Sequence, residues 1–339
     1  MKLYICLTYY HALITMIKGL LTEEKLDVLL ANDIPEYEAL YSRLVSSGVF
    51  GNVIEYDAKN IRDRRKGKKD LLYYLTDKRI IKKKIETYCK CDFSKYQDIY
   101  VYHDISEIGK YFLMNKIKYH LLEDALDYFK YFDKYYDVKE GSYKDGTFKF
   151  FLKKYFNIGY KAWGSSDECI DIEVNDLKGI KITKEKCFEV PRKDLFEKLS
   201  VKDRILIFDT FAAGKELSGT NGKNAIICTQ PLYQDSFVST ENDQLQVFRS
   251  VIREYYDKKY KIIIKPHPRD EADYSEILDE FNADLIDKNL PSEILNFKPD
   301  AKYDVAVSIT STAINFLQYA EEKRFMGREY ITEVLSGCQ

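Results

Sequence analysis

Short apolar runs alternate with longer amphipathic segments along most of this chain. Residues 262–264 are three isoleucines, and β-branched runs are typical of strands buried on both faces of a parallel sheet. Between such runs, apolar residues recur at helical spacing. Strands are predicted at 2–7, 27–30, 52–56, 98–102, 116–122, 204–208, 224–228, 262–264 and 304–309. Helices are predicted at 12–22, 36–46, 105–115, 243–256 and 313–322. The alternation predicts an α/β fold.

The length of the chain predicts more than one domain. With 339 residues it exceeds what one hydrophobic core comfortably serves. A Rossmann-like domain is expected over residues 1–160, followed by a connector at 161–186 with turn-forming and acidic residues. A second Rossmann-like domain is expected over 187–322, and the tail 323–339 could return to the first domain.

Charge and cysteine content narrow the classes of protein. The formal net charge is −2, which argues against a general nucleic-acid binder. No run of about 18 apolar residues is present, so no membrane-spanning helix is expected. The seven cysteines are scattered and fit neither a disulfide framework nor a zinc pattern, which favours the reducing cytoplasm. Residues 62–90 are rich in lysine and arginine. They form either a solvated helix face or a peripheral contact with the anionic inner face of the membrane.

A histidine between two prolines follows the isoleucine strand. Pro266 and Pro268 fix the backbone on either side of His267, and Lys265 and Arg269 add two positive charges. Ligands of open α/β sheets bind at the carboxyl ends of the strands, so this segment suits a phosphate or an anionic leaving group. A turn whose histidine merely packs is the alternative.

Two adjacent carboxylates, Glu123 and Asp124, follow the strand predicted at 116–122. Mutual repulsion raises the pKa of one of them, as a general base requires. The alternative is that both acids only favour the first turn of a following helix.

Polar side chains follow several other predicted strands. A helix N-terminus with free hydroxyls forms an anion site, which applies to the helix predicted at 313–322. No Asp-X-Asp pair lies at a strand end, so no metal site is expected; Asp171 and Glu173 have that spacing but fall in the connector. The further candidates are Thr8, Tyr10 and His11 after the first strand, Gln230 and Pro231, Glu293, and Ser311 with Thr312.

Three of these motifs resemble those of bacterial sialyltransferases: an acidic pair followed by glycine, His-Pro, and Ser-Ser/Thr. The order of 123–125, 265–268 and 311–312 along the chain agrees. The segments 7–11 and 229–232 are most similar to those of glycosyltransferase family 52, whose members include sialyltransferases for lipooligosaccharide or capsular polysaccharide. The resemblance spans nearly the whole chain but depends on about a dozen positions. Ala125 departs from it, since the family usually has glycine there, which could shift the backbone beside the acid.

The resemblance implies a GT-B architecture, in which two Rossmann-like domains face an interdomain cleft. It also implies inverting, metal-independent transfer of sialic acid from CMP-sialic acid to a galactose-type hydroxyl, without a cofactor. Glu123 would be the general base, with Asp124 the reserve, and His267 would support the departing phosphate. Donor binding would fall to Gln230, Pro231, Lys265, Pro266, Pro268, Arg269, Glu293, Ser311 and Thr312; Thr8, Tyr10 and His11 would lie on the acceptor side.

Two alternatives compete with this interpretation. A His-Pro pair after a strand also occurs in CDP-glycerol glycerophosphotransferases, whose second catalytic histidine would here have to be His103 or His120. Other nucleotide-sugar donors are compatible with the same motifs. A non-catalytic nucleotide-binding scaffold is the other alternative, although a binder has no need of a base. The linkage, the natural acceptor and the oligomeric state do not follow from the sequence.

Overall fold

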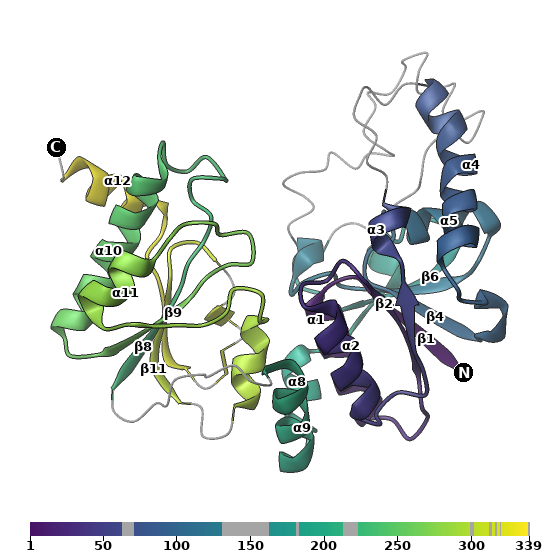
Figure 1. Cartoon of the computed structure of the whole chain (residues 1–339), viewed down its shortest axis with the longest axis horizontal. Helices are drawn as coiled ribbons and strands as arrows, with labels where there is room; N and C mark the ends of the chain where they lie inside the picture. The colour runs from purple at the N-terminus through teal and green to yellow at the C-terminus, as the bar shows by residue number, and fades with distance from the viewer. Residues whose placement is uncertain are drawn as a thin grey trace. The chain divides into compact units, whose positions relative to one another are not determined.

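The computed structural model describes residues 1–62, 71–130, 163–180, 183–212, 223–298, 302–311, 314–315, 317–318 and 320–337. The chain divides into two compact units, Met1–Ser200 and Val201–Gln339. Each unit is built on its own parallel β-sheet with helices beside it (Figure 1).

The sheet of the first unit has the strand order β3-β2-β1-β4-β5-β6-β7, and every neighbouring pair is parallel. Its first five strands follow the 3-2-1-4-5 order of Rossmann-like domains. The carboxyl ends of parallel strands meet at one edge, and residues after those ends can therefore gather. The strands are β1 (Lys2–Cys6), β2 (Asp27–Ala31), β3 (Val53–Tyr56), β4 (Asp98–Val101), β5 (Tyr119–Leu122), β6 (Cys169–Val174) and β7 (Cys187–Glu189).

Helix α1 (Tyr9–Leu20) shows how the sequence builds the layer beside this sheet. Thr8 begins it, because its extended backbone lets the side chain accept a hydrogen bond from the backbone N–H of His11. Leu13, Ile14 and Ile17 are fully buried. The other helices among the described residues of this unit are α2 (Tyr37–Ser46), α3 (Ala58–Ile61), α4 (Leu71–Tyr88), α5 (Glu107–Asn115) and α8 (Arg192–Glu197), with 3-10 turns η1 (Phe93–Lys95) and η2 (Lys184–Lys186).

The sheet of the second unit has the order β10-β9-β8-β11-β12, again parallel throughout. Counted from the first strand of the unit, this is the same 3-2-1-4-5 order. Its strands are β8 (Asn224–Cys228), β9 (Lys261–Lys265), β10 (Asp284–Leu285), β11 (Tyr303–Ser308) and β12 (Ala320–Phe325). The helical elements that the structure describes in it are α9 (Val201–Ala212), α10 (Glu241–Asp257), α11 (Ser275–Phe281), η3 (Ser292–Phe297) and α12 (Arg328–Ser336).

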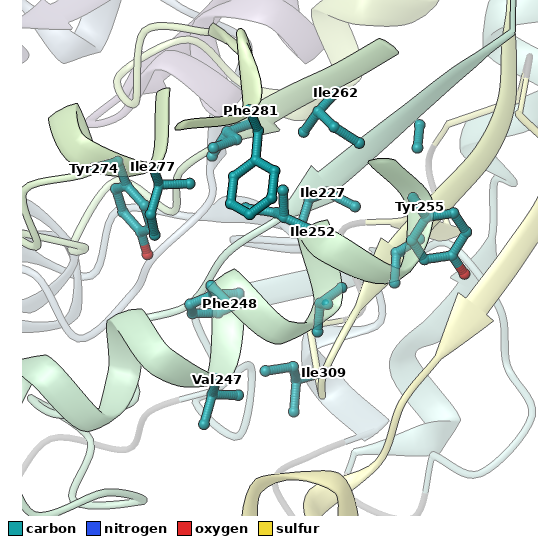
Figure 2. Packing of buried hydrophobic residues seen from close by; sticks show 14 of the residues in the cluster. Ile227, Val247, Phe248, Ile252, Tyr255, Ile262, Tyr274, Ile277, Phe281 and Ile309 are labelled. Atoms are coloured by element: carbon teal, nitrogen blue, oxygen red, sulfur yellow. The ribbon is translucent and has the colours of Figure 1, made fainter. Parts of the chain in front are cut away.

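The core of the second unit lies between this sheet and the helices α10, α11 and α12. Figure 2 shows Phe248 and Ile252 of α10 and Phe281 of α11 together with Ile227 and Ile262 of the sheet. Burying one such side chain stabilises the fold by roughly 1.5–3 kcal/mol. The prediction of a buried parallel strand at the three isoleucines is therefore confirmed.

Most predicted elements are confirmed to within three residues at either end, but the strand predicted at 204–208 is wrong. These residues lie within helix α9, where Ile207 and Phe211, four residues apart, are fully buried while Ile205 is 42% exposed. That is helical spacing, and a short apolar run does not by itself separate a strand from a helix.

The predicted connector, 161–186, and the start of the second domain at residue 187 also need correction. Residues 169–174 form β6 and 187–189 form β7, both in the sheet of the first unit, and the second unit begins at Val201. The acidic stretch looked like a loop because Asp171 and Glu173 are charged. In the structure His120 pairs with Asp171, and Lys18 and Arg192 pair with Glu173.

The described part of the tail, residues 323–337, belongs to the second unit. β12 pairs with β11, and Ile331 of α12 lies in the core of the second unit, with Met326 and Tyr330 packed against it. The helix predicted at 313–322 is wrong over residues 320–322, which belong to β12. Among the helices that the structure describes, none has the length and apolar character to cross a membrane.

Candidate active site

Most of the predicted site residues lie at the carboxyl edge of one sheet or the other. In the first unit, Thr8 and His11 follow β1, and Glu123 and Asp124 follow β5. In the second unit, one group of candidates follows β8, β9 and β11: Gln230, Pro231, His267, Pro268, Arg269 and Ser311. Each edge contains the point where the strand order reverses, between β1 and β4 or between β8 and β11, which is where open α/β sheets bind ligands.

Asp124 and His11 form the central contact of the first edge. His11 Nε2 lies 2.6 Å from Asp124 Oδ1, the histidine side chain is fully buried, and the carboxylate side chain is 25% exposed. Burial acts to raise the pKa of Asp124, but the hydrogen bond from His11 outweighs it, and the pKa is lowered. Asp124 is therefore an ionised carboxylate that solvent can reach.

The imidazole of His11 is held on its other side as well. Its Nδ1 accepts a hydrogen bond from the backbone N–H of Leu7 at 3.1 Å, so its proton is on Nε2 and points at Asp124. Its ring stacks on Tyr102 with centroids 4.2 Å apart. The ring orientation is thus determined by the β1–α1 turn and by the strand beside it.

Glu123, the expected base, has different surroundings. Its side chain is fully buried, and Oε2 accepts a hydrogen bond of 2.7 Å from the backbone N–H of Asn175. Burial raises the pKa of Glu123 to about 7, although the Asn175 bond and the Arg192 charge act against it. A pKa near neutrality suits a base, but a base must first reach the proton it removes, and the position of Glu123 opposes that role.

The sequence does not predict the buried ionic cluster that lies beside Glu123. Arg192 Nη1 lies 2.6 Å from Glu173 Oε1, and Lys18 Nζ lies 2.7 Å from Glu173 Oε2. Asn175 joins this cluster to Glu123, because its backbone N–H donates to the Glu123 carboxylate and its side chain accepts from the backbone N–H of Arg192. No local motif marks these residues, which come from α1, β6 and the start of α8.

The remaining acceptor-side candidates surround the His11–Asp124 pair. Thr8 is exposed and caps α1, and the ring of Tyr10 meets that of His11 edge-on at 6.3 Å. His103 is half-buried after β4 with its ring against Trp163. Burial lowers the pKa of His103, and the charge of Asp124 acts in the opposite direction.

His267 is held in the second unit as the sequence predicts, after β9 and between its prolines. Its Nδ1 accepts a hydrogen bond from the backbone N–H of Arg269 at 3.0 Å, so the proton is on Nε2. Burial, followed by the charges of Arg269 and Lys265, lowers the pKa of His267. A neutral imidazole with an Nε2–H donor results. Arg269 itself forms a two-pronged contact with Asp235.

A buried carboxylate, Asp270, anchors this loop and was missed by the sequence analysis. Its backbone N–H donates to the carbonyl of His267, and its side chain accepts hydrogen bonds from Thr229, Gln244 and Tyr274. Asp270 is 2% exposed. Its position directly after His-Pro-Arg was the only available signal.

Gln230 connects two of the strand ends. Its side-chain carbonyl accepts from the backbone N–H of Thr310 at 2.9 Å, and its amide donates to the Thr310 hydroxyl. Pro231 is buried. The backbone N–H of Ser311 donates to the Ser308 hydroxyl, and Thr312 lies outside the described residues. Residues 312–313 and 316, at and near the start of the predicted helix, lie outside the described residues, so the anion site at its N-terminus stays a prediction.

Lys265 and Glu293, two of the predicted donor-binding residues, are both buried. Lys265 is 2% exposed, and its Nζ donates to the carbonyls of Pro266 and Lys288. These hydrogen bonds support the His267 loop. Burial raises the pKa of Glu293 to about 6.

Among the described residues, no three His, Cys, Asp or Glu side chains gather into a group that could hold a metal ion. Metal independence stays a prediction.

The sequence matches the model of one protein family, glycosyltransferase family 52, over residues 43–326. A protein of Haemophilus influenzae, described only as uncharacterized, is 33% identical over 132 residues, which is 39% of this chain and 40% of that protein. The match therefore spans less than half of that relative.

Solved structures resemble the whole chain at low identity. A sialyltransferase from Photobacterium damsela is 14% identical, with 96% of this chain and 73% of that chain covered and a TM-score of 0.53. An α/β-galactoside α-2,3-sialyltransferase from Photobacterium phosphoreum is 16% identical, with 96% and 89% covered and a TM-score of 0.48. At such low identity, the similarity to the Photobacterium damsela structure shows the fold alone. With the two parallel sheets, it confirms the predicted α/β fold of GT-B type with two Rossmann-like domains.

Proposed function

Because the chain belongs to glycosyltransferase family 52, we propose that it is an inverting, metal-independent sialyltransferase. It moves sialic acid from CMP-sialic acid to a galactose-type hydroxyl of a cell-surface glycan, in capsule or lipooligosaccharide. The observation that carries the proposal is Asp124: an ionised, partly exposed carboxylate at the carboxyl edge of the first sheet, held by His11. Such a group can take a proton from a sugar hydroxyl.

The proposed reaction is a single displacement. Asp124 accepts the proton of the acceptor hydroxyl while that oxygen bonds to the anomeric carbon of sialic acid. The bond from this carbon to the phosphate oxygen breaks, its electron pair leaves with CMP, and the anomeric configuration inverts. His267 donates from Nε2 to the departing phosphate, where negative charge develops. The tautomer set by Arg269 supports that role.

This assignment departs from the sequence-based hypothesis that Glu123 is the base. Glu123 is fully buried and accepts a backbone hydrogen bond, whereas the neighbouring carboxylate is open to solvent. We assign Glu123 to the support of the strand end, through Asn175.

The test is CMP release from CMP-sialic acid in EDTA, with and without lactose, for wild type and matched variants. Asp124→Asn should lower kcat by roughly 10²–10⁴, while Glu123→Gln retains most of the activity. Asp171→Asn removes the carboxylate of a second His–Asp pair, His120–Asp171, and is the control. Full activity of Asp124→Asn would contradict the base assignment.

The donor is tested in the same assay. Absence of lactose-dependent CMP release together with turnover of CDP-glycerol would favour the glycerophosphotransferase alternative. His103 is the histidine that supports this alternative, since the charge of Asp124 acts to raise the pKa of this half-buried imidazole. His120 is instead occupied by Asp171.

The place of action is also proposed, as the cytoplasm at the inner face of the membrane. Six cysteines among the described residues are free thiols, which agrees with a reducing compartment. On α4, Lys82 and Lys83 are exposed, whereas Lys84 donates to the carbonyls of Ile61 and Arg62. Replacing Lys82 and Lys83 with glutamine should weaken binding to anionic vesicles; unchanged binding would reject the membrane contact.

A further inference from the structure

We propose that His11 is the positioning residue of the transfer reaction: it holds the carboxylate of Asp124 in one orientation by donating a hydrogen bond from Nε2. The proposal rests on Asp124 being the base, and it gives a specific role to a residue that the sequence places only on the acceptor side. It starts from the 2.6 Å contact between two residues that are 113 positions apart in the chain.

The β1–α1 turn holds His11 at two points. The hydroxyl of Thr8 accepts from its backbone N–H at 3.2 Å, and the backbone N–H of Leu7 donates to Nδ1 at 3.1 Å. Both bonds use neighbours within four residues along the chain. The imidazole is therefore oriented by local backbone geometry.

Buried contacts hold the flat face of the ring. The ring of Tyr102 stacks on it with an interplanar angle of 8°. The Tyr102 hydroxyl lies 3.0 Å from Thr15 Oγ1, and this oxygen lies 3.3 Å from Cys6 Sγ. The Tyr102 ring, and through it the His11 ring, is thereby tied to α1 and β1.

The hydrogen-bond pattern also determines what His11 can do with a proton. Nδ1 already accepts from Leu7, so a second proton on the ring would place two N–H donors against each other. His11 therefore donates to Asp124 and does not take over the proton that Asp124 removes from the acceptor. That proton leaves from the exposed side of Asp124.

Among the described residues, the titratable groups that face Asp124 are His11 on α1 and His103 after β4. Both act to keep the carboxylate ionised, but only His11 touches it. Removing the His11 donor should therefore raise the pKa of Asp124 and free its side chain to rotate. A hydrogen bond to a charged group is strong enough for a change of about one to two pH units.

Three variants separate positioning from folding. His11→Phe keeps an aromatic ring for Tyr102 and loses both hydrogen bonds, while His11→Gln keeps an N–H donor. His120→Gln breaks the other His–Asp pair of this unit and is the control. Thermal unfolding of each variant shows that it is folded before any other measurement is interpreted.

The first readout is the pH dependence of kcat/KM. In His11→Phe, the acidic limb should move up by about one to two pH units and kcat should fall by roughly tenfold to a hundredfold. His11→Gln should recover most of the shift, and His120→Gln should follow wild type. An acidic limb that stays in place in folded His11→Phe, or a Gln variant as impaired as Phe, would overturn the proposal.

The second readout does not need turnover. Carboxyl ¹³C NMR follows the ionisation of Asp124, assigned by comparison with Asp124→Asn, in wild type and in His11→Phe. A raised Asp124 pKa in the variant supports the contact even if no sialic acid is transferred, in which case the proposed function fails alone. An unchanged pKa overturns the role of His11, whatever the activity.

Discussion

Glu123 and Asp124 are consecutive residues, yet their carboxylates lie in opposite surroundings. The first is fully buried and accepts a backbone hydrogen bond, and the second is 25% exposed and held by His11. Successive residues after a strand point in different directions, so one acid can support the strand end while the other faces solvent. The pKa values diverge accordingly, raised for Glu123 and lowered for Asp124.

Glu123→Gln is expected to change how stability depends on pH. The ordinary pKa of 4.5 is raised to about 7 in the fold, so between these values the folded chain keeps a proton that the unfolded chain releases. The stability of wild type therefore falls as the pH rises through this window. Above pH 7 the Gln variant should be more stable by up to about 3 kcal/mol, as measured by urea unfolding at several pH values.

The control for this prediction is Glu197→Gln, which removes an exposed carboxylate from α8. Its difference from wild type should be nearly independent of pH. A difference between Glu123→Gln and wild type that is equally flat would show that Glu123 is not held protonated by burial.

The protonation state of His267 is expected to depend on Arg269. Burial and the charges of Arg269 and Lys265 lower the pKa of His267. Arg269→Gln removes one of these charges and leaves Asp235 without its ion-pair partner, so the pKa should rise by about half a unit to one unit at low salt. ¹⁵N NMR of the four histidines measures it directly. Because Arg269 is largely exposed, added salt should shrink the change; a shift in the other direction would contradict the assignment.

The segments that the sequence predicted best are those in which the order is local. The isoleucine run, the two prolines around His267 and the hydroxyl of Thr8 before α1 act within a few residues of one another. Local propensity and backbone restriction are therefore enough to place them. The acidic pair was found for the same reason, because it directly follows an apolar strand.

What the sequence did not reveal depends on partners far apart along the chain. Asp124 meets His11, and Glu173 meets Lys18 and Arg192, only once the sheet is assembled. These contacts determine which of the two carboxylates is exposed. They also neutralise the charge of Glu173 within strand β6. Without them, the choice between Glu123 and Asp124 could not be made, and residues 169–174 read as a loop.

The buried ionic cluster is expected to be sensitive to the loss of one partner. Arg192→Met leaves Glu173 with Lys18 alone in a buried site and should cost about 3–5 kcal/mol of stability. Lys193→Met, at the next position on α8, removes a charge from an exposed pair with Glu197 and should cost less than about 1 kcal/mol. Chemical denaturation compares the two.

A further variant shows that the charge, and not the packing, is responsible. Replacing Lys18, Glu173 and Arg192 together by apolar residues of similar size should recover much of the stability, since no buried charge is then left unpaired. Equal effects of Arg192→Met and Lys193→Met would contradict the burial of the cluster.

Asp270 is expected to hold the loops after β8 and β9 together. Asp270→Ala leaves the donors of Thr229, Gln244 and Tyr274 without their acceptor in a buried site, at a cost of about 3 kcal/mol. The His267 loop should then lose its anchor. Hydrogen exchange of the β8 and β9 amides should accelerate, and calorimetry should show weaker CMP binding.

Asp273→Ala is the matched control, because Asp273 is an exposed carboxylate three residues further on that accepts from the backbone N–H of Ser275. It should change stability by less than about 1 kcal/mol and leave CMP binding intact. If Asp270→Ala weakened stability but bound CMP as wild type does, Asp270 would support the core of the second unit without determining the geometry of the His267 loop. If both variants behaved alike, the buried network would have no energetic importance, and the conformation of the His267 loop would be due to its prolines alone.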